Sequence, residues 1–188
     1  MRIDQRYTLP AIWLHWIVAA LILVNIALGL TADFFPDAWV RTVIDTHKSV
    51  GISVLGLAIL RLAWRLSHDP PPLPATYPSF ERTFAHLVHI LLYVAIFALP
   101  LTGWAHDSAW KDWEGHPMRL FGLVPWPRIA AIATLDPEAK EQMHDTLFVA
   151  HQYAGYALYG LVGLHIVGAF KHQFWDRDPE LQRMWPKG

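Results

Sequence analysis

Four long apolar stretches constrain this chain of 188 residues more than any other feature of its sequence. They cover residues 9–30, 43–64, 84–104 and 147–174, and apart from histidines they contain few polar side chains. A helix that crosses a bilayer needs about 20 mainly apolar residues, so each stretch is long enough to span a membrane. Charged residues make up only 16% of the chain, below the level of soluble domains. The sequence therefore predicts an all-α, integral membrane four-helix bundle that forms a single domain over residues 1–188.

The connections and the basic residues predict how this bundle is oriented. Residues 67–82 are rich in proline, which predicts a short, stiff and extended loop. Residues 105–143 contain several tryptophans and are expected to lie on the membrane surface with short helices. The two termini and the proline-rich loop share one side, which carries nine Lys or Arg residues against six on the other side. By the positive-inside rule, both termini are expected to be cytoplasmic.

The composition excludes several kinds of chemistry. The chain has no cysteine, which rules out disulfides, thiolate metal sites, cysteine nucleophiles and thioether-attached haem. Its net charge of -1 gives no reason to expect a nucleic-acid partner. The unusual feature that remains is the presence of 11 histidines. Histidine inside a membrane helix is costly unless it is paired or ligated, so the histidines in the apolar stretches are the candidate functional residues.

Four of these histidines are predicted to form two pairs. His151 and His165 lie 14 residues apart in the last stretch, which places them on nearly the same helix face and about 21 Å apart along the axis. His15 lies near the cytoplasmic end of the first stretch, at the depth of His165. His47 begins the second stretch at the outer surface, at the depth of His151. We therefore predict the pairs His15/His165 and His47/His151.

Two imidazoles that face each other across an apolar gap are typical of a bis-histidine haem site, in which both rings bind the iron. Small side chains that leave room for a porphyrin follow each proposed ligand by four residues: Ala19, Gly51, Gly155 and Ala169. The alternative is that the histidines are hydrogen-bonded structural residues. Zinc is disfavoured because no cysteine is present and no carboxylate lies beside the pairs.

Three further histidines are candidates for contacts with a quinone or a haem propionate. His86 and His89 lie near the start of the third stretch, where Ile90 and Tyr93 would crowd a porphyrin, so we favour interfacial or hydrogen-bonding roles over ligation. His172 continues the face of His165 and either donates to a quinone carbonyl or is solvated. Three arginines on the same side could pair with propionates: Arg61, Arg65 and Arg82. We assign no function to His68, His106, His116 and His144.

Several short motifs are spread along the chain: Leu14-His15-Trp16, His47-Lys48-Ser49-Val50-Gly51, Ala85-His86-Leu87-Val88-His89, Ala98-Leu99-Pro100-Leu101-Thr102-Gly103, Phe121-Gly122-Leu123, and His151 to His165 followed by His172. Together they resemble the bacterial cytochrome b561 family over essentially all 188 residues. The resemblance implies a multi-pass electron-transport protein of the bacterial inner membrane with two haem b groups. It also implies that His15, His47, His151 and His165 are the iron ligands and that ubiquinone is the electron acceptor.

The leading functional hypothesis is therefore an oxidoreductase that takes electrons from superoxide at the periplasmic face and reduces ubiquinone, as the superoxide oxidases of this family do. Lys48 and Arg41 lie where they could attract a small anion. The second hypothesis is a haem b membrane anchor that conducts electrons for a periplasmic hydrogenase or dehydrogenase. A third, a metal transporter, would need carboxylates inside the membrane, where the stretches offer only Asp45 at the outer margin. The lipid bilayer, quinone and a small redox substrate or redox protein are the expected partners.

Overall fold

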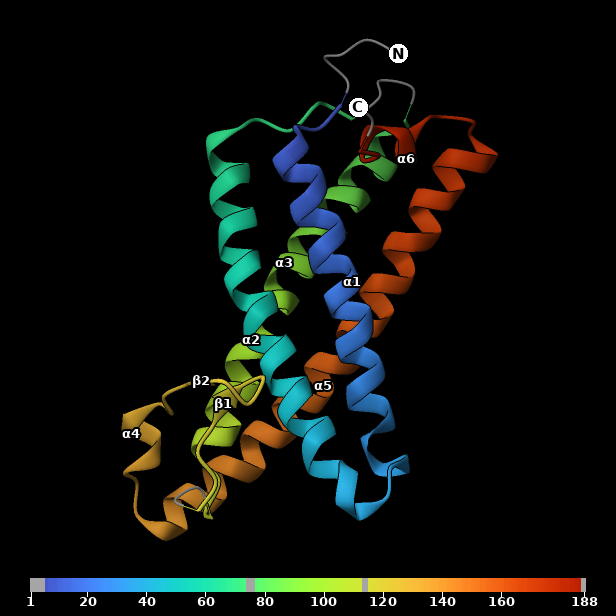
Figure 1. Ribbon diagram of the computed structural model, residues 1–188. Helices are drawn as coiled ribbons and strands as arrows, with labels where there is room; N and C mark the ends of the chain where they lie inside the picture. The colour runs from blue at the N-terminus through green and yellow to red at the C-terminus, as the bar shows by residue number, and fades with distance from the viewer. Residues whose placement is uncertain (1–5, 74–76, 113–114, 187–188) are drawn as a thin grey trace.

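The structure is a computed structural model that describes residues 6–73, 77–112 and 115–186. Within these residues four long helices cross the molecule (Figure 1): α1 (Leu9–Thr31), α2 (Asp37–Ser67), α3 (Ser79–Ser108) and α5 (Pro137–Phe170). Each is long and apolar enough to span a membrane. The predicted all-α membrane bundle is confirmed. The cytoplasmic placement of the termini and the single-domain organisation stay predictions, and Pro74 of the proline-rich loop and Trp113 lie outside the described residues.

Three of the helices begin earlier than predicted. Helix α2 begins at Asp37, α3 at Ser79 and α5 at Pro137, five to ten residues before the apolar stretches at residues 43, 84 and 147. The early start of α5 follows from its first turn, where the Asp136 carboxylate accepts a hydrogen bond from Ala139 N at 3.0 Å and Pro137 occupies the first helical position. These first turns carry charged residues. The apolar stretch in the sequence therefore marks only the part of each helix that lies in the membrane.

The connection between α3 and α5 contains a short helix, as expected, and also a hairpin that was not predicted. The chain turns between two strands of two residues each at Phe121 and Gly122, which have φ angles of 51° and 72°. Strands this short leave no alternating pattern in a sequence. The remaining elements are η2 (Ala32–Phe34), β1 (Arg119–Leu120), β2 (Val124–Pro125), α4 (Ala130–Ala133), η3 (Lys171–Trp175), which is a π-helix, and α6 (Glu180–Arg183).

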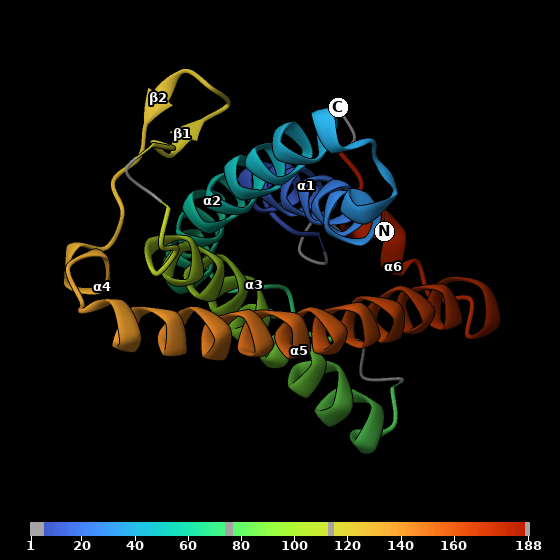
Figure 2. The ribbon, with the colours of Figure 1, turned by 90° about the horizontal axis from the view of Figure 1, so that it is seen from below.

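The four long helices pack unevenly. Helix α3 packs along α5, α1 packs along α2, and α2 also contacts α3, whereas the backbone of α5 stands off from α1 and α2 (Figure 2). At mid-height the core consists of Ala58 of α2, Ala95 and Ile96 of α3 and Leu158 of α5. Leu158 is seven residues from both His151 and His165. The apolar core therefore separates two layers of histidines.

The two ends of the bundle differ in how they are closed. At the end that carries the described terminal residues, here the terminal end, Tyr7 N donates to Arg183 O and Trp16 Nε1 donates to Met184 O. Arg183 is buried and its guanidinium donates to the carbonyl oxygen of Pro72 at 2.7 Å. At the opposite end, here the hairpin end, β1, β2 and α4 cover one side of the bundle (Figure 1). One layer of histidines lies near each end.

Candidate functional site

The structure brings together the residues of both predicted histidine pairs. The ring centres of His15 and His165 are 6.0 Å apart at the terminal end, and those of His47 and His151 are 6.1 Å apart at the hairpin end. The two rings of each pair are nearly perpendicular, at 74° and 83°. Each pair reaches from α5 to α1 or α2, across the space where the helix backbones stand apart.

The separation within each pair fits a shared iron. An imidazole nitrogen binds a metal at about 2 Å, so two rings on opposite sides of one ion have centres about 6 Å apart. Both observed separations match this value. Paired imidazoles on facing helices of a bundle suit haem iron, while closed zinc sites need four ligands. The residues present therefore fit two haem groups, one in each layer.

Hydrogen bonds orient the two rings at the hairpin end. His47 Nδ1 lies 3.1 Å from the carbonyl oxygen of Asn25, and since a carbonyl only accepts, the ring nitrogen is the donor. The lone pair of His47 is then on Nε2, the nitrogen that a metal would bind. His151 Nδ1 lies 3.1 Å from Thr102 Oγ1. Partners of this kind hold metal-ligating histidines in place in many proteins.

A third ring lies beside the pair at the terminal end. The ring centre of His89 is 5.2 Å from that of His165, closer than two ligands of one iron would be. His89 therefore fits a neighbour of the pair better than a ligand. His86 is exposed, and its Nδ1 bonds to the carbonyl oxygen of Arg82 at 2.7 Å. Of these two candidate contacts, only His89 reaches the histidine layer.

Two glycines that sequence reasoning missed pack against the histidines of the hairpin end. A Cβ atom on Gly29 would lie 3.2 Å from His47 Cε1, and one on Gly103 would lie 3.1 Å from His151 Cε1. The glycines that were predicted to leave room face other side chains, since Gly51 faces Asn25 and Gly155 faces Tyr159 at 3.5 Å. The prediction considered only the ligand's own helix, whereas the close approaches come from neighbouring helices.

Gly103→Ala is expected to destabilise the protein because its methyl group would push the His151 ring by a few tenths of an ångström. Gly160→Ala on α5 is the matched control, because nothing lies within 4 Å of its Cβ position. Helix propensity alone favours alanine by about 0.5–1 kcal/mol at either site. We therefore expect the thermal midpoint in detergent to rise for Gly160→Ala and to fall for Gly103→Ala. Equal rises would show that the His151 ring moves freely.

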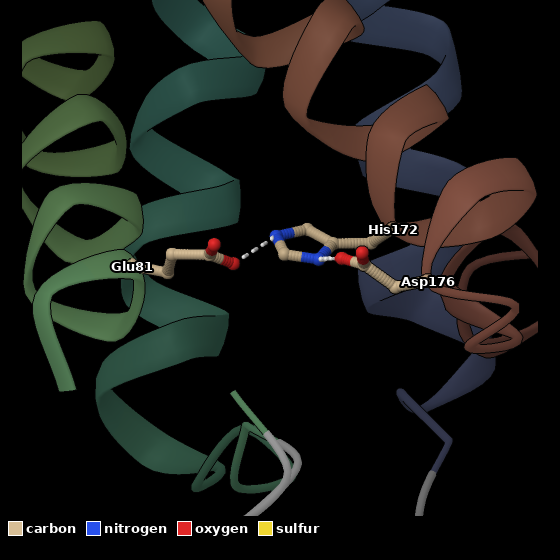
Figure 3. Close-up of side chains that lie close together, drawn as sticks. All are labelled: Glu81, His172 and Asp176. Atoms are coloured by element: carbon tan, nitrogen blue, oxygen red, sulfur yellow. Dashed lines mark hydrogen bonds and ion pairs between the residues drawn. The ribbon is translucent and has the colours of Figure 1, made fainter. Parts of the chain in front are cut away.

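Figure 3 shows a polar cluster at the terminal end that joins α3 to the end of α5. His172 Nδ1 lies 2.7 Å from Asp176 Oδ2, and His172 Nε2 lies 3.8 Å from Glu81 Oε2. Lys171 Nζ lies 2.7 Å from Glu81 and 2.9 Å from Asp176. The π-helical turn makes the contact between Lys171 and Asp176 possible, because Asp176 N bonds to Lys171 O five residues earlier. Lys171 contacts both carboxylates, so the cluster is an ion-pair network in which one ammonium group offsets one of the two negative charges.

This network shields His172, the third candidate contact. The ring of Tyr77 stacks on His172 at 4.0 Å, and the Tyr77 hydroxyl donates to Glu180 at 2.8 Å. Burial, followed by the hydrogen bond to Glu180, raises the pKa of Tyr77, so this hydroxyl stays protonated. The hydrogen bond from Lys171 is the main cause that lowers the pKa of Asp176. The side chain of His172 is 14% exposed, so most of it is covered.

A cavity at the terminal end is lined by three arginines, Arg6, Arg61 and Arg65. Arg61 Nε donates to the Tyr93 hydroxyl at 3.2 Å, and the guanidinium carbons of Arg61 and Arg65 each lie 5.9 Å from the centre of the Tyr93 ring. Tyr93 thus holds both guanidinium groups at the cavity, where they suit an anionic group such as a propionate. Arg82, the third predicted partner, does not line this cavity.

Charged side chains also cluster at the hairpin end, beside His47. Asp107 is buried, with Lys48 Nζ 2.6 Å from its Oδ1 and Arg128 Nη2 3.1 Å from its Oδ2. Asp45 contacts Lys48 at 3.4 Å and Arg41 at 3.6 Å. The two cations predicted to attract an anion therefore lie beside carboxylates, and the five side chains together carry a net charge of +1. Sequence reasoning missed Asp107 because the predicted span ended before it.

Comparison with known proteins agrees with this arrangement. The sequence model of the family described as prokaryotic cytochrome b561 matches residues 6–187. The chain is 30% identical over 187 residues to cytochrome b561 homolog 2 of Escherichia coli, covering 97% of this chain and 93% of that protein. It is 26% identical over 187 residues to the probable superoxide oxidase CybB of Yersinia pestis, covering 97% of each. The resemblance expected from the sequence is confirmed: the chain belongs to the prokaryotic cytochrome b561 family, a group of multi-pass haem b proteins of the bacterial inner membrane that take part in electron transfer.

Proposed function

We propose that this protein moves electrons across the membrane with two haem b groups, taking them from superoxide at the hairpin end and delivering them to ubiquinone at the terminal end. Two superoxide ions would each lose one electron and become dioxygen, and ubiquinone would take up two electrons and two protons. The hairpin end would face the periplasm and both termini the cytoplasm, as the distribution of basic residues predicts. Haem b supplies the one-electron chemistry when bound.

The observation that carries this proposal is the stacking of two histidine pairs at opposite ends of one helix. His15 with His165 and His47 with His151 are the residues that would hold the two haems. Both pairs have the spacing of ligands that share one iron, and the apolar mid-height core lies between the two layers. Such an arrangement gives each membrane surface its own redox centre.

The polar groups at the terminal end support quinone reduction there. His89 lies beside His165, and the network of His172, Glu81 and Asp176 lies at the same end (Figure 3). Quinone reduction consumes protons, and imidazole and carboxylate groups near the surface can deliver them. Arg61 and Arg65 would bind the propionates of the nearby haem. His86 is exposed and fits an interfacial role.

The hairpin end supports a small anionic substrate. Arg41, Lys48 and Arg128 exceed the carboxylates of their cluster by one charge, and Lys48 directly follows His47. A local positive charge next to a redox centre raises the encounter rate with superoxide, and it acts within about 8 Å at physiological ionic strength. The arrangement favours superoxide over a neutral donor.

The proposal is tested by adding superoxide to the purified holoprotein. We expect reduction of the haem absorbance bands and, once ubiquinone is added, repeated turnover with formation of ubiquinol. His151→Ala is the control that removes the redox centre of the hairpin end and should abolish reduction by superoxide. Unchanged haem spectra after superoxide addition to wild-type protein would contradict the proposal.

One observation favours a second candidate, an electron conduit for a periplasmic redox enzyme. The turn of the hairpin exposes a group of apolar side chains, Phe121, Leu123 and Val124, which are 57%, 78% and 57% exposed. A docking surface for another protein would have this composition. Reduction by superoxide only in the presence of a copurifying subunit would favour this candidate.

A further inference from the structure

The hydroxyl group of Thr102 lies where it can orient the ring of His151. Its Oγ1 is 2.8 Å from the carbonyl oxygen of Ala98, 3.0 Å from that of Leu99 and 3.1 Å from His151 Nδ1. A carbonyl oxygen can only accept, so the one hydroxyl proton points to a carbonyl of its own helix. The lone pairs of Oγ1 then face the ring, and His151 Nδ1–H is the donor.

This donation fixes both the tautomer and the orientation of His151. With the proton on Nδ1, the lone pair lies on Nε2, the nitrogen available to iron. Gly103 packs against the ring edge, where a Cβ would lie 3.1 Å from Cε1. The ring is therefore held on two sides by α3.

Among the described residues, the histidine pair at the terminal end has no hydrogen bonds of this kind. In the described part of the chain, no hydrogen bond joins a ring nitrogen of His15 or His165 to a protein acceptor, whereas both His47 and His151 have one. An imidazole that donates a hydrogen bond from Nδ1 is a more basic ligand. A more basic ligand stabilises ferric iron relative to ferrous iron and so lowers the reduction potential.

We propose that Thr102 is a positioning residue that lowers the reduction potential of the haem at the hairpin end through its hydrogen bond to His151. This inference rests on the proposed haem ligation by His47 and His151. A lower potential at the hairpin end than at the terminal end favours electron movement toward the terminal end, which is the direction of the proposed function.

Thr102→Val tests this role because it replaces the hydroxyl with a methyl group of similar shape. In redox titrations of the holoprotein followed by absorbance, we expect a three- to tenfold weaker preference for ferric iron at the hairpin end. This corresponds to a rise of about 30 to 59 mV for one electron. The titration step of the hairpin-end haem is the one that is missing in the His47→Ala variant. The titration step of the terminal-end haem should not move. Thr102→Ser, which keeps the hydroxyl, should restore the wild-type potential.

Thr83→Val is the matched control, because Thr83 Oγ1 donates to Ser79 O of the same helix at 3.1 Å and contacts no histidine pair. It should leave both potentials unchanged. An unshifted Thr102→Val protein, or a Thr102→Ser protein that shifts as the valine variant does, would overturn the role of Thr102. If the valine variant loses the hairpin-end haem, retention of that haem in the serine variant supports the proposal and loss from both variants overturns it.

The haem content of His151→Ala separates this inference from the proposed function. Two haems per chain in that variant would refute the ligand assignment itself. One haem per chain in His151→Ala, together with an unshifted potential in Thr102→Val, would refute only the positioning role.

Discussion

His165→Ala is expected to halve the haem content of the purified protein, from two haem b groups per chain to one. The variant removes one of the two rings whose centres lie 6.0 Å apart at the terminal end, and no other side chain of α5 occupies that position. The lost haem should be the one nearer the quinone, so superoxide should still reduce the remaining haem while turnover with ubiquinone stops. Haem extraction with pyridine, normalised to protein, measures the change.

His89→Ala is the control for this experiment, since His89 lies beside His165 without the spacing of a shared ligand. We expect it to retain both haems, and we expect His15→Ala to lose the same haem as His165→Ala. The pairing would be wrong if His89→Ala lost a haem while His15→Ala kept both. His165 would then pair with α3 instead of α1.

Asp107→Ala is expected to give the largest loss of stability among the surface and buried ion pairs. Asp107 is 4% exposed and contacts both Lys48 and Arg128, so its removal takes the buried carboxylate away from two cations, while Lys48 keeps its 3.4 Å contact with Asp45. Removing one partner of a buried ion pair costs about 3 kcal/mol, which corresponds to a fall of about 6 to 12 °C in the thermal midpoint of a chain of this size. Circular dichroism during heating in detergent measures this fall.

Asp45→Ala is the matched control, because Asp45 contacts Lys48 and Arg41 but its side chain is 48% exposed. Exposed ion pairs contribute at most about 1 kcal/mol, so its midpoint should fall by no more than about 4 °C. Equal losses from the two variants would mean that burial of Asp107 does not decide its contribution.

The periodicity and depth of the histidines predicted most of the candidate site. His151 and His165 share a helix, and their spacing fixes both their common face and their separation along the axis. Partners at matching depths followed from the direction in which each span crosses the membrane. His89 needed the structure, because its three-dimensional distance to His165 distinguishes a neighbour from a ligand.

Contacts between helices were beyond the sequence. The histidines of the hairpin end are oriented by residues of α1 and α3, two helices that contain neither of those histidines. These residues are Gly29, Gly103, Thr102 and Asn25, the last through its carbonyl oxygen. Which residue of one helix meets a given residue of another depends on the rotation and stagger of the two helices. A periodic sequence constrains these quantities only to within a turn.

The sequence by itself determined the four membrane helices, the family and the depths of the four central histidines, because bilayer thickness and helical repeat act along one chain segment at a time. Tertiary structure alone decided how the charges are compensated and which groups support each ring. Asp107 of α3 contacts Lys48 of α2, and it also contacts Arg128 of the connection between α3 and α5. The Glu81 and His172 side chains meet only because α3 begins where α5 ends in space. Such contacts depend on how separate segments pack, which no local pattern encodes.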